Sequence, residues 1–197
     1  VGETVTPLQG NGYRLPTAAE WEFAGRGGVT ATYTTGNDDR ELASAAWIIS
    51  NSGGRTHAVR ELPANQFGLF DIHGNVWEWV EDIYDPSYYQ QFVVQPAIDP
   101  PGPKLTVSRH ELRGGAWDAG ASFGRLSSRL SHENIESRNY IGFRVALSVE
   151  GVKTAINRTR GLLFDVRAAS LDLSAVTYDG AHDLTLEGWF KPLGVNA

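Results

Sequence analysis

The sequence predicts a mixed fold of one short helix, several short strands and long irregular loops, and three observations lead to this prediction. A helix signal covers residues 18–25, a stretch dominated by Thr, Ser, Asn, Gly and Asp runs from 29 to 70, and period-two alternation appears at 76–79 and again at 184–191. The chain has 197 residues and a net charge of −6. This length accommodates one full domain with residues left over.

The helix is predicted from its two ends. Thr17 and Glu20 have the spacing of a capping box, and Gly27 with Gly28 supplies the stop. Within the helix, Trp21 and Ala24 are three residues apart and share one face. We expect this face to pack inward, with Trp21 in the core.

The stretch DIHGNVWEW, residues 71–79, sets acids between large apolar side chains. Alternation with period two puts Val76 and Glu78 on one face of a strand and both tryptophans on the other. Asp71 and Glu78 also flank a glycine turn, and mixed carboxylate and carbonyl oxygens are the ligands that Ca²⁺ takes. A half-buried strand with a solvated Glu78 explains the spacing equally well. His73 is interpreted as a turn residue.

Composition excludes several classes of function. The excess of acids argues against a nucleic-acid partner and an anionic membrane surface, and no apolar run is long enough to insert into a bilayer. The chain contains neither Cys nor Met. Thiol chemistry is therefore absent, and we expect the chain to be processed or excised from a larger polypeptide. The pair Glu81 and Asp82 is interpreted as an exposed acidic edge.

Four blocks, in this order, resemble the formylglycine-generating enzyme family, also called sulfatase-modifying factors: YRLPTAAEWEFAGRGG, NQFGLFDIHGNVWEWVEDIYD, LRGGAWD and NYIGFRVAL. The resemblance spans residues ~10 to 148. It implies an α+β fold of the C-type-lectin-like kind, with much irregular structure and bound calcium. The implied ligands of one Ca²⁺ are the side chains of Asp71 and Glu78 and the carbonyls of Gly74 and Val76.

Catalytic members of this family oxidise a substrate cysteine with a copper ion that two cysteines hold after the GG pair. In this chain those positions fall at Ala119 and Gly124, which offer Cu(I) no soft ligand. We therefore expect no oxidase activity. A second calcium site of the family, expected within AAWIISNSGGRTHAV, lacks its Asn and Asp ligands and is not assigned.

Related non-enzymatic domains, among them the variable proteins of diversity-generating retroelements, bind ligands with the region between RGG.W and GFR. The resemblance implies a ligand-binding face made of Trp117, Asp118, Phe123, Ser127, Ser128, His132, Asn134 and Tyr140. Such a mixture of aromatic and small polar residues is typical of adaptable binding surfaces. The alternative is structural, with Trp117 and Phe143 in the core and the nearby arginines paired with acids.

The predicted organisation is a family domain at 1–148 that is incomplete at its N-terminus, a linker at 149–160 and a β segment at 161–197. The β segment alternates, with Leu184, Leu186 and Phe190 on one face. It weakly resembles the opening strands of concanavalin-like or laminin-G-like jelly rolls.

These observations lead to an expected function. We expect a calcium-stabilised, non-catalytic module that binds a protein or carbohydrate ligand within a larger protein outside the cytoplasm or at the cell surface. Two alternatives remain: an enzyme of the same family whose metal has oxygen or nitrogen ligands, and an architectural domain of a surface protein.

Overall fold

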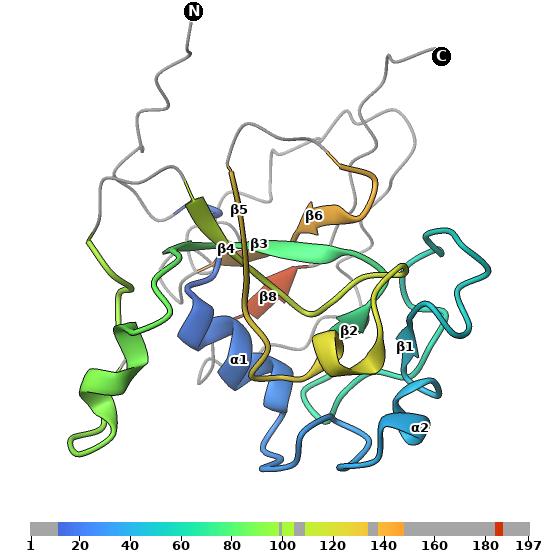
Figure 1. The fold of residues 1–197 in the computed structure, drawn as a ribbon, viewed down its shortest axis with the longest axis horizontal. Helices are drawn as coiled ribbons and strands as arrows, with labels where there is room; N and C mark the ends of the chain where they lie inside the picture. Colours follow the sequence, from blue (N-terminus) through green and yellow to red (C-terminus); the bar gives the residue numbers. More distant parts are fainter. Residues whose placement is uncertain (1–11, 99, 105–108, 134–137, 148–183, 187–197) are drawn as a thin grey trace, which may run out of the picture. The chain divides into compact units, whose positions relative to one another are not determined.

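The computed structural model describes residues 12–98, 100–104, 109–133, 138–147 and 184–186. The chain divides into two compact units, one formed by Leu15–Arg144 with Glu187–Ala197 and the other by Val1–Arg14 with Val145–Leu186. The first unit contains α1 (Ala18–Arg26), α2 (Asp39–Leu42), β1 (Ala46–Trp47), β2 (His73–Gly74), β3 (Trp77–Ile83), the 3₁₀ turn η1 (Tyr88–Phe92), β4 (Arg109–Arg113), the 3₁₀ turn η2 (Ala121–Gly124), β5 (Leu130–Glu133) and β6 (Ile141–Phe143) (Figure 1).

Helix α1 begins and ends where the sequence predicts, within one residue. The amide of Glu20 donates to the Thr17 hydroxyl and the amide of Thr17 donates to the Glu20 carboxylate, which completes the capping box. Gly27 ends the helix in the left-handed conformation, with φ 55°. Trp21 is buried as predicted, but Ala24 stays partly exposed because Gly25 is the residue that faces Ile72 and Leu126.

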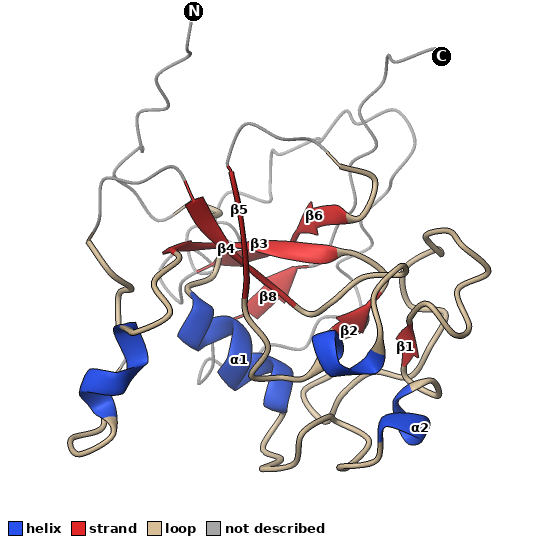
Figure 2. Ribbon diagram, viewed as in Figure 1, coloured by secondary structure: helices blue, strands red, loops and turns tan. Residues whose placement is uncertain are grey.

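Loops make up most of the chain between α1 and β3 (Figure 2). The prediction of loops and short strands is confirmed here, since α2 has four residues and β1 has two. Strand β1 pairs in parallel with β2, which sets Trp47 opposite Gly74. Gly74 has φ 71° and lies so close to the Trp47 carbonyl that a side chain would overlap with it, so this pairing requires glycine.

A four-stranded sheet with the order β5, β4, β3, β6 forms the centre of this unit. Strands β3 and β4 are antiparallel, with Glu78 opposite Arg113, and β4 pairs antiparallel with β5. Strand β6 runs parallel to β3 on its other side, with Trp77 opposite Ile141. Helix α1 packs against β3 and β4.

The two faces of β3 explain the interleaved acids and tryptophans. Glu78, Val80 and Asp82 share the face toward α1: Glu78 accepts a hydrogen bond from the Trp21 indole, and Asp82 accepts one from the Ala18 amide. The predicted alternation is confirmed. The interpretation of Asp82 as exposed is wrong, because it is 3% exposed beneath α1, whereas Glu81 points outward and is exposed as predicted.

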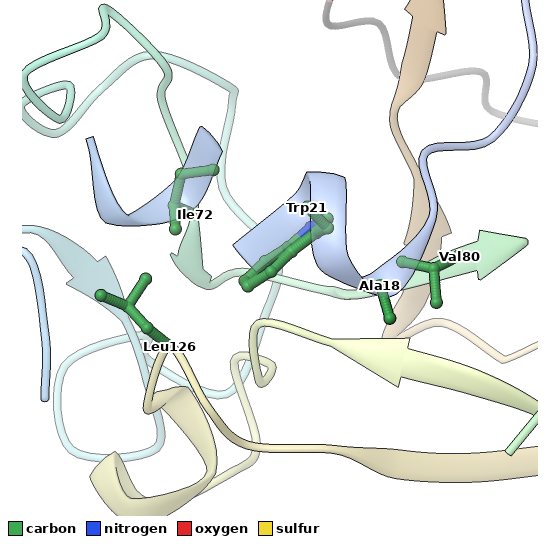
Figure 3. Packing of buried hydrophobic residues seen from close by; sticks show 5 residues of the cluster. All are labelled: Ala18, Trp21, Ile72, Val80 and Leu126. Carbon is green, nitrogen blue, oxygen red and sulfur yellow. The ribbon is translucent and has the colours of Figure 1, made fainter. Parts of the chain in front are cut away.

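Trp21 connects the helix to the sheet in the main apolar cluster. Figure 3 shows its indole between Ile72 and Leu126 on one side and Ala18 and Val80 on the other. Two further clusters extend the core. One contains Tyr33, Leu42, Ala46 and Ile48, and the other contains Trp77, Leu112 and Ala116.

In the second unit, Arg14 bridges to Ala146, and β7 (Val145–Leu147) pairs antiparallel with β8 (Leu184–Leu186). Strand β8 falls within the predicted β segment, whereas Phe190 and the predicted linker at 149–160 lie outside the described residues. Within the described ranges, no helix is long and apolar enough to cross a bilayer.

Candidate functional site

Glu78, one of the two acids in the predicted calcium set, is deeply buried and forms hydrogen bonds with two side chains. Its Oε2 accepts hydrogen bonds of 2.6 Å from the Trp21 indole and from Nε of Arg144, and its Oε1 accepts one of 2.6 Å from Nη2 of Arg144. Glu78 is 1% exposed and Arg144 is 5% exposed. The solvated Glu78 that the sequence left open is therefore wrong, because a buried ion pair holds this carboxylate.

Asp71 lies in the loop before β2 and is also buried. Burial raises the pKa of its carboxyl group, and the charges of Glu78 and Glu61 act in the same direction, against the amide of Arg60 and the charge of Arg144. The Arg60 amide donates to Oδ2 at 2.8 Å. The backbone at Asp71 is left-handed, with φ 54°, a conformation that costs energy in a non-glycine residue. A nearby cation would relieve the charge repulsion at this carboxylate.

The two carboxylates of the predicted calcium set differ in how many lone pairs remain unused. A carboxylate has about four lone-pair sites. Three of those on Glu78 are used by Trp21 and Arg144, whereas the described residues use one on Asp71. No cluster of three or more metal-binding His, Cys, Asp or Glu side chains occurs among the described residues. Asp71 is therefore the carboxylate of the predicted set that keeps the most unused lone pairs among the described residues.

Asn75 organises the loops beside this turn, and sequence reasoning did not single it out. Its side chain accepts from the His57 amide at 3.0 Å and donates to the His57 carbonyl, while its backbone accepts from the amide of Trp117 at 2.9 Å. Its φ is 58°. Because asparagine tolerates the left-handed conformation better than most residues, the pair Gly74 and Asn75 was the available signal.

His73 is not a turn residue, which corrects the interpretation from sequence. It lies in β2, is 2% exposed, and its Nδ1 lies 2.6 Å from the Gly124 carbonyl. The Thr34 amide donates to its Nε2 at 3.1 Å, so Nδ1 carries the proton that is donated to Gly124. Burial lowers the pKa of His73 to about 4, which keeps the ring neutral. This histidine connects two loops.

Trp117 begins the predicted ligand-binding face and is held firmly by its backbone. Its amide donates to the Asn75 carbonyl, and its carbonyl accepts from the Ser52 hydroxyl at 2.8 Å. The indole is partly exposed, and its Nε1 donates to the Asn139 carbonyl at 3.4 Å. The core alternative for Trp117 is therefore only partly right: the backbone is fixed inside the fold while one side of the indole reaches solvent.

Phe123 and Tyr140 gather around Trp77. Phe123 is 48% exposed, and its ring meets that of Trp77 edge to face at 6.1 Å. Tyr140 is half-buried and packs against the cluster of Trp77, Leu112 and Ala116, next to the Asn139 that Trp117 contacts. Glycine makes this arrangement possible, because a side chain at Gly115 would crowd the backbone of Gly124. We call Trp117, Phe123 and Tyr140 the aromatic group.

The polar members of the predicted face are spread more widely. His132 lies on β5, where its ring contacts Trp79 edge to face at 6.3 Å. Ser127 is exposed beside Arg125, whose carbonyl accepts from the Ser128 amide. Asp118 is exposed next to Trp117, and Asn134 lies outside the described residues. The structure therefore brings together the aromatic members of the face but places Ser127 and His132 on other elements.

The positions that correspond to the copper ligands are Ala119, two residues before η2, and Gly124, the last residue of η2. Ala119 is partly exposed and its carbonyl accepts from the Ile49 amide, whereas Gly124 is buried and its carbonyl accepts from His73. Neither residue has a side chain that could bind a metal ion. Of the arginines in this region, Arg129 pairs with Glu111 and Arg144 with Glu78, while Arg125 forms no ion pair with a described residue.

Comparison with known proteins places this geometry in a family. The Sulfatase-modifying factor enzyme 1-like domain matches residues 2–149. The formylglycine-generating enzyme of Streptomyces coelicolor is 35% identical over 68% of this chain and 46% of its own length. The inactive C-alpha-formylglycine-generating enzyme 2 of Mus musculus is 31% identical over 70% of this chain and 44% of its own. The serine/threonine-protein kinase pkn1 of Chlamydia caviae is 37% identical over 71% of this chain but only 22% of its own. The chain thus spans less than half the length of these relatives.

Solved structures agree with the sequence comparison. Treponema denticola variable protein 1 superposes with a TM-score of 0.63 and 37% identity, covering 68% of this chain and 47% of that protein. PvdO from Pseudomonas aeruginosa gives a TM-score of 0.60 and 28% identity, covering 68% and 51%. The predicted α+β, C-type-lectin-like fold of the formylglycine-generating-enzyme type is thereby confirmed. The chain belongs to the sulfatase-modifying-factor family.

Proposed function

We propose that the chain is a calcium-stabilised, non-catalytic binding module that presents its ligand-binding face between Trp117 and Tyr140. The observation that carries the proposal is the aromatic group, in which Phe123 is exposed and Trp117 and Tyr140 are partly exposed, close in the chain to the positions where the copper ligands of the catalytic relatives are expected. Here those positions are Ala119 and Gly124, in a chain without cysteine. The chemistry of the site thus favours contact over oxidation.

The aromatic group is suited to binding because its backbone is rigid. Hydrogen bonds from Ser52 and to Asn75 fix Trp117, and Phe123 rests on the buried Trp77. Rigid aromatic side chains contribute large contact areas at low entropic cost, and exposed aromatic residues on a rigid frame are typical binding hot spots. The described segment 114–129, which carries Trp117 and Phe123, consists of η2 and loops, so that its exposed residues can vary while the frame is kept.

Calcium enters the proposal as a structural ion held by Asp71, Gly74, Val76 and Glu78. Support comes from the raised pKa of the buried Asp71 carboxyl group and from the left-handed backbone at Asp71 and Gly74. Bound there, the ion would fix the turn that leads into β3 and therefore the strand that carries Trp77. A protein with this architecture fits a module of a larger polypeptide that works outside the cytoplasm or at the cell surface.

The test of the binding face is a screen on arrays of glycans and peptides with the wild-type chain and a Trp117→Ala, Phe123→Ala double variant. Phe23 and Phe67 form an exposed pair of rings 6.0 Å apart that does not belong to the face, so a Phe23→Ala, Phe67→Ala variant is the matched control. We expect hits of the wild type to be kept by the control and lost by the double variant. Hits that the double variant keeps would contradict the proposal.

The non-catalytic part is tested separately. Incubation with Cu(I), oxygen and a cysteine-containing peptide should produce no more formylglycine than the same mixture without the protein. Conversion of the cysteine to formylglycine would refute this part of the proposal without affecting the binding face.

A further inference from the structure

A polar groove lies between the loop that follows α1 and the segment that follows η2. Its volume is about 360 Å³, and it is lined by Arg26, Thr30, Ala31, Thr32, Asn37, Asp39, Arg125 and Ser127. The groove includes Ser127 of the predicted face but none of the aromatic group. A test of the groove is therefore independent of the proposed function.

The buried hydroxyl of Tyr33 positions one of these lining residues, Asp39. This hydroxyl donates to Oδ1 of Asp39 at 2.6 Å and also lies 3.2 Å from the Ala121 carbonyl. Burial and the contact with Asp39 raise the pKa of this hydroxyl, whereas the nearby Arg125 guanidinium lowers it. Asp39 and Arg125 thus both line the groove near the same hydroxyl, and both residues are exposed.

Several polar atoms of the groove have unused hydrogen-bonding capacity. The Arg125 guanidinium has no ion pair among the described residues, and Oδ2 of Asp39 accepts no hydrogen bond from them. Asn37 uses its Oδ1 to accept from the amide and hydroxyl of Thr32, which leaves its amide nitrogen as a donor. Arg26 is different, because Glu22 and the Ala31 carbonyl already occupy its guanidinium.

The charges of Arg125 and Asp39 indicate which chemical groups a ligand of this groove would carry. The planar guanidinium of Arg125 can bind a carboxylate of the ligand through two parallel hydrogen bonds. The carboxylate of Asp39 would accept a hydrogen bond from a donor group next to that ligand carboxylate. Asp39 would repel a doubly charged phosphate, and the groove has no aromatic ring on which a base could stack. Its volume is at the lower end of ligand pockets, which span about 300 to 1,000 Å³.

We propose that this groove binds a small polar carboxylate with a hydroxyl or amino donor next to its carboxyl group. The carboxylate contacts Arg125 and Asn37, and the adjacent donor contacts Asp39. The shared chemistry covers both α-hydroxy acids and α-amino acids, and the experiment separates these two sources.

The experiment is a titration of the full chain, followed by amide chemical shifts, with four probes: L-serine, lactate, acetate and ethanolamine. Serine and lactate contain both groups, acetate lacks the donor and ethanolamine lacks the carboxylate. We expect shifts at residues of the groove with serine or lactate, weaker shifts with acetate and none with ethanolamine. Absence of shifts with all four probes, or equal affinity for ethanolamine and serine, would overturn the proposal.

Variants identify the contacts. Arg125→Gln should weaken binding by at least about tenfold. Arg125→Lys keeps the charge but cannot make the two-point guanidinium contact, so its affinity should lie between those of the wild type and Arg125→Gln. Asp39→Asn keeps an acceptor for Tyr33 and should weaken serine more than lactate, since only serine presents a charged donor. Arg55→Gln, at another exposed arginine, is the control and should bind like the wild type. Unchanged binding by Arg125→Gln refutes the assignment.

Discussion

Replacing Glu78 by Gln tests the buried ion pair on which β3 and β6 depend. The substitution keeps the shape of the side chain and an oxygen that can accept from Trp21. It removes the negative charge that neutralises Arg144, a guanidinium that is 5% exposed. Arg144 directly follows β6, and β6 pairs with β3 beside Glu78, so the loss acts at the centre of the sheet.

The magnitude follows from burial. Breaking a buried pair by removing one partner costs about 3–5 kcal/mol, because the remaining charge stays buried after losing its counter-charge. We therefore expect Glu78→Gln to lower the free energy of unfolding by about 3 kcal/mol. If both partners are removed in Glu78→Gln, Arg144→Met, the double variant should be more stable than Glu78→Gln alone, since the buried guanidinium charge is removed together with that of Glu78.

The assay is urea unfolding at pH 7 followed by tryptophan fluorescence, with EDTA present so that bound calcium does not contribute. Glu81→Gln is the matched control, because Glu81 lies on the same strand but points to solvent, and its substitution should change stability by less than about 0.5 kcal/mol. A cost for Glu78→Gln below about 1 kcal/mol, or a double variant as unstable as the sum of the two single variants, would refute the reasoning.

Two further predictions concern backbone fit and pH. Gly74→Ala should destabilise the chain by several kcal/mol in urea unfolding, since it combines a left-handed φ with overlap at the Trp47 carbonyl. The control Gly54→Ala, at φ 75° in open space, should cost only about 1–2 kcal/mol. Equal costs for the two variants would show that the close approach of Gly74 to Trp47 is unimportant. Burial, together with the charges of Glu111 and Glu81, raises the pKa of Asp82 to about 6, against the Ala18 amide and the charge of Arg129. The folded state therefore holds a proton that the unfolded chain has already released between about pH 4 and 6, so Asp82 contributes a loss of stability of up to about 3 kcal/mol as the pH rises through this window. Asp82→Asn should remove this contribution from the urea midpoints measured across that range, and an identical pH profile in both proteins would contradict the assignment.

Local sequence signals predicted the elements that depend on neighbours in the chain. The capping box at Thr17 and the stop at Gly27 define α1 because both act within a few residues, and the alternation around Glu78 reflects the pleat of a single strand. The burial of Trp21 followed from its place on the helix face.

The rest depended on contacts between distant residues, which one sequence does not specify. Glu78 and Arg144 are 66 positions apart, and nothing near Glu78 signals that its partner is an arginine. Asp82 looked exposed beside Glu81 because helix α1 and Gly102, both distant in sequence, are what bury it. The predicted face was a contiguous run of chain, but η2 turns Phe123 toward Trp77 while β5 carries His132 to Trp79.

The calcium proposal is tested most directly by thermal unfolding of the wild type and of Asp71→Asn in excess CaCl₂ and in EDTA. A ligand that binds only the folded state stabilises it by about 2.7 kcal/mol at a hundred times its Kd. We predict a higher Tm in calcium than in EDTA for the wild type and a smaller or absent difference for Asp71→Asn. Melting curves of the wild type that coincide in calcium and in EDTA would contradict the proposed calcium site.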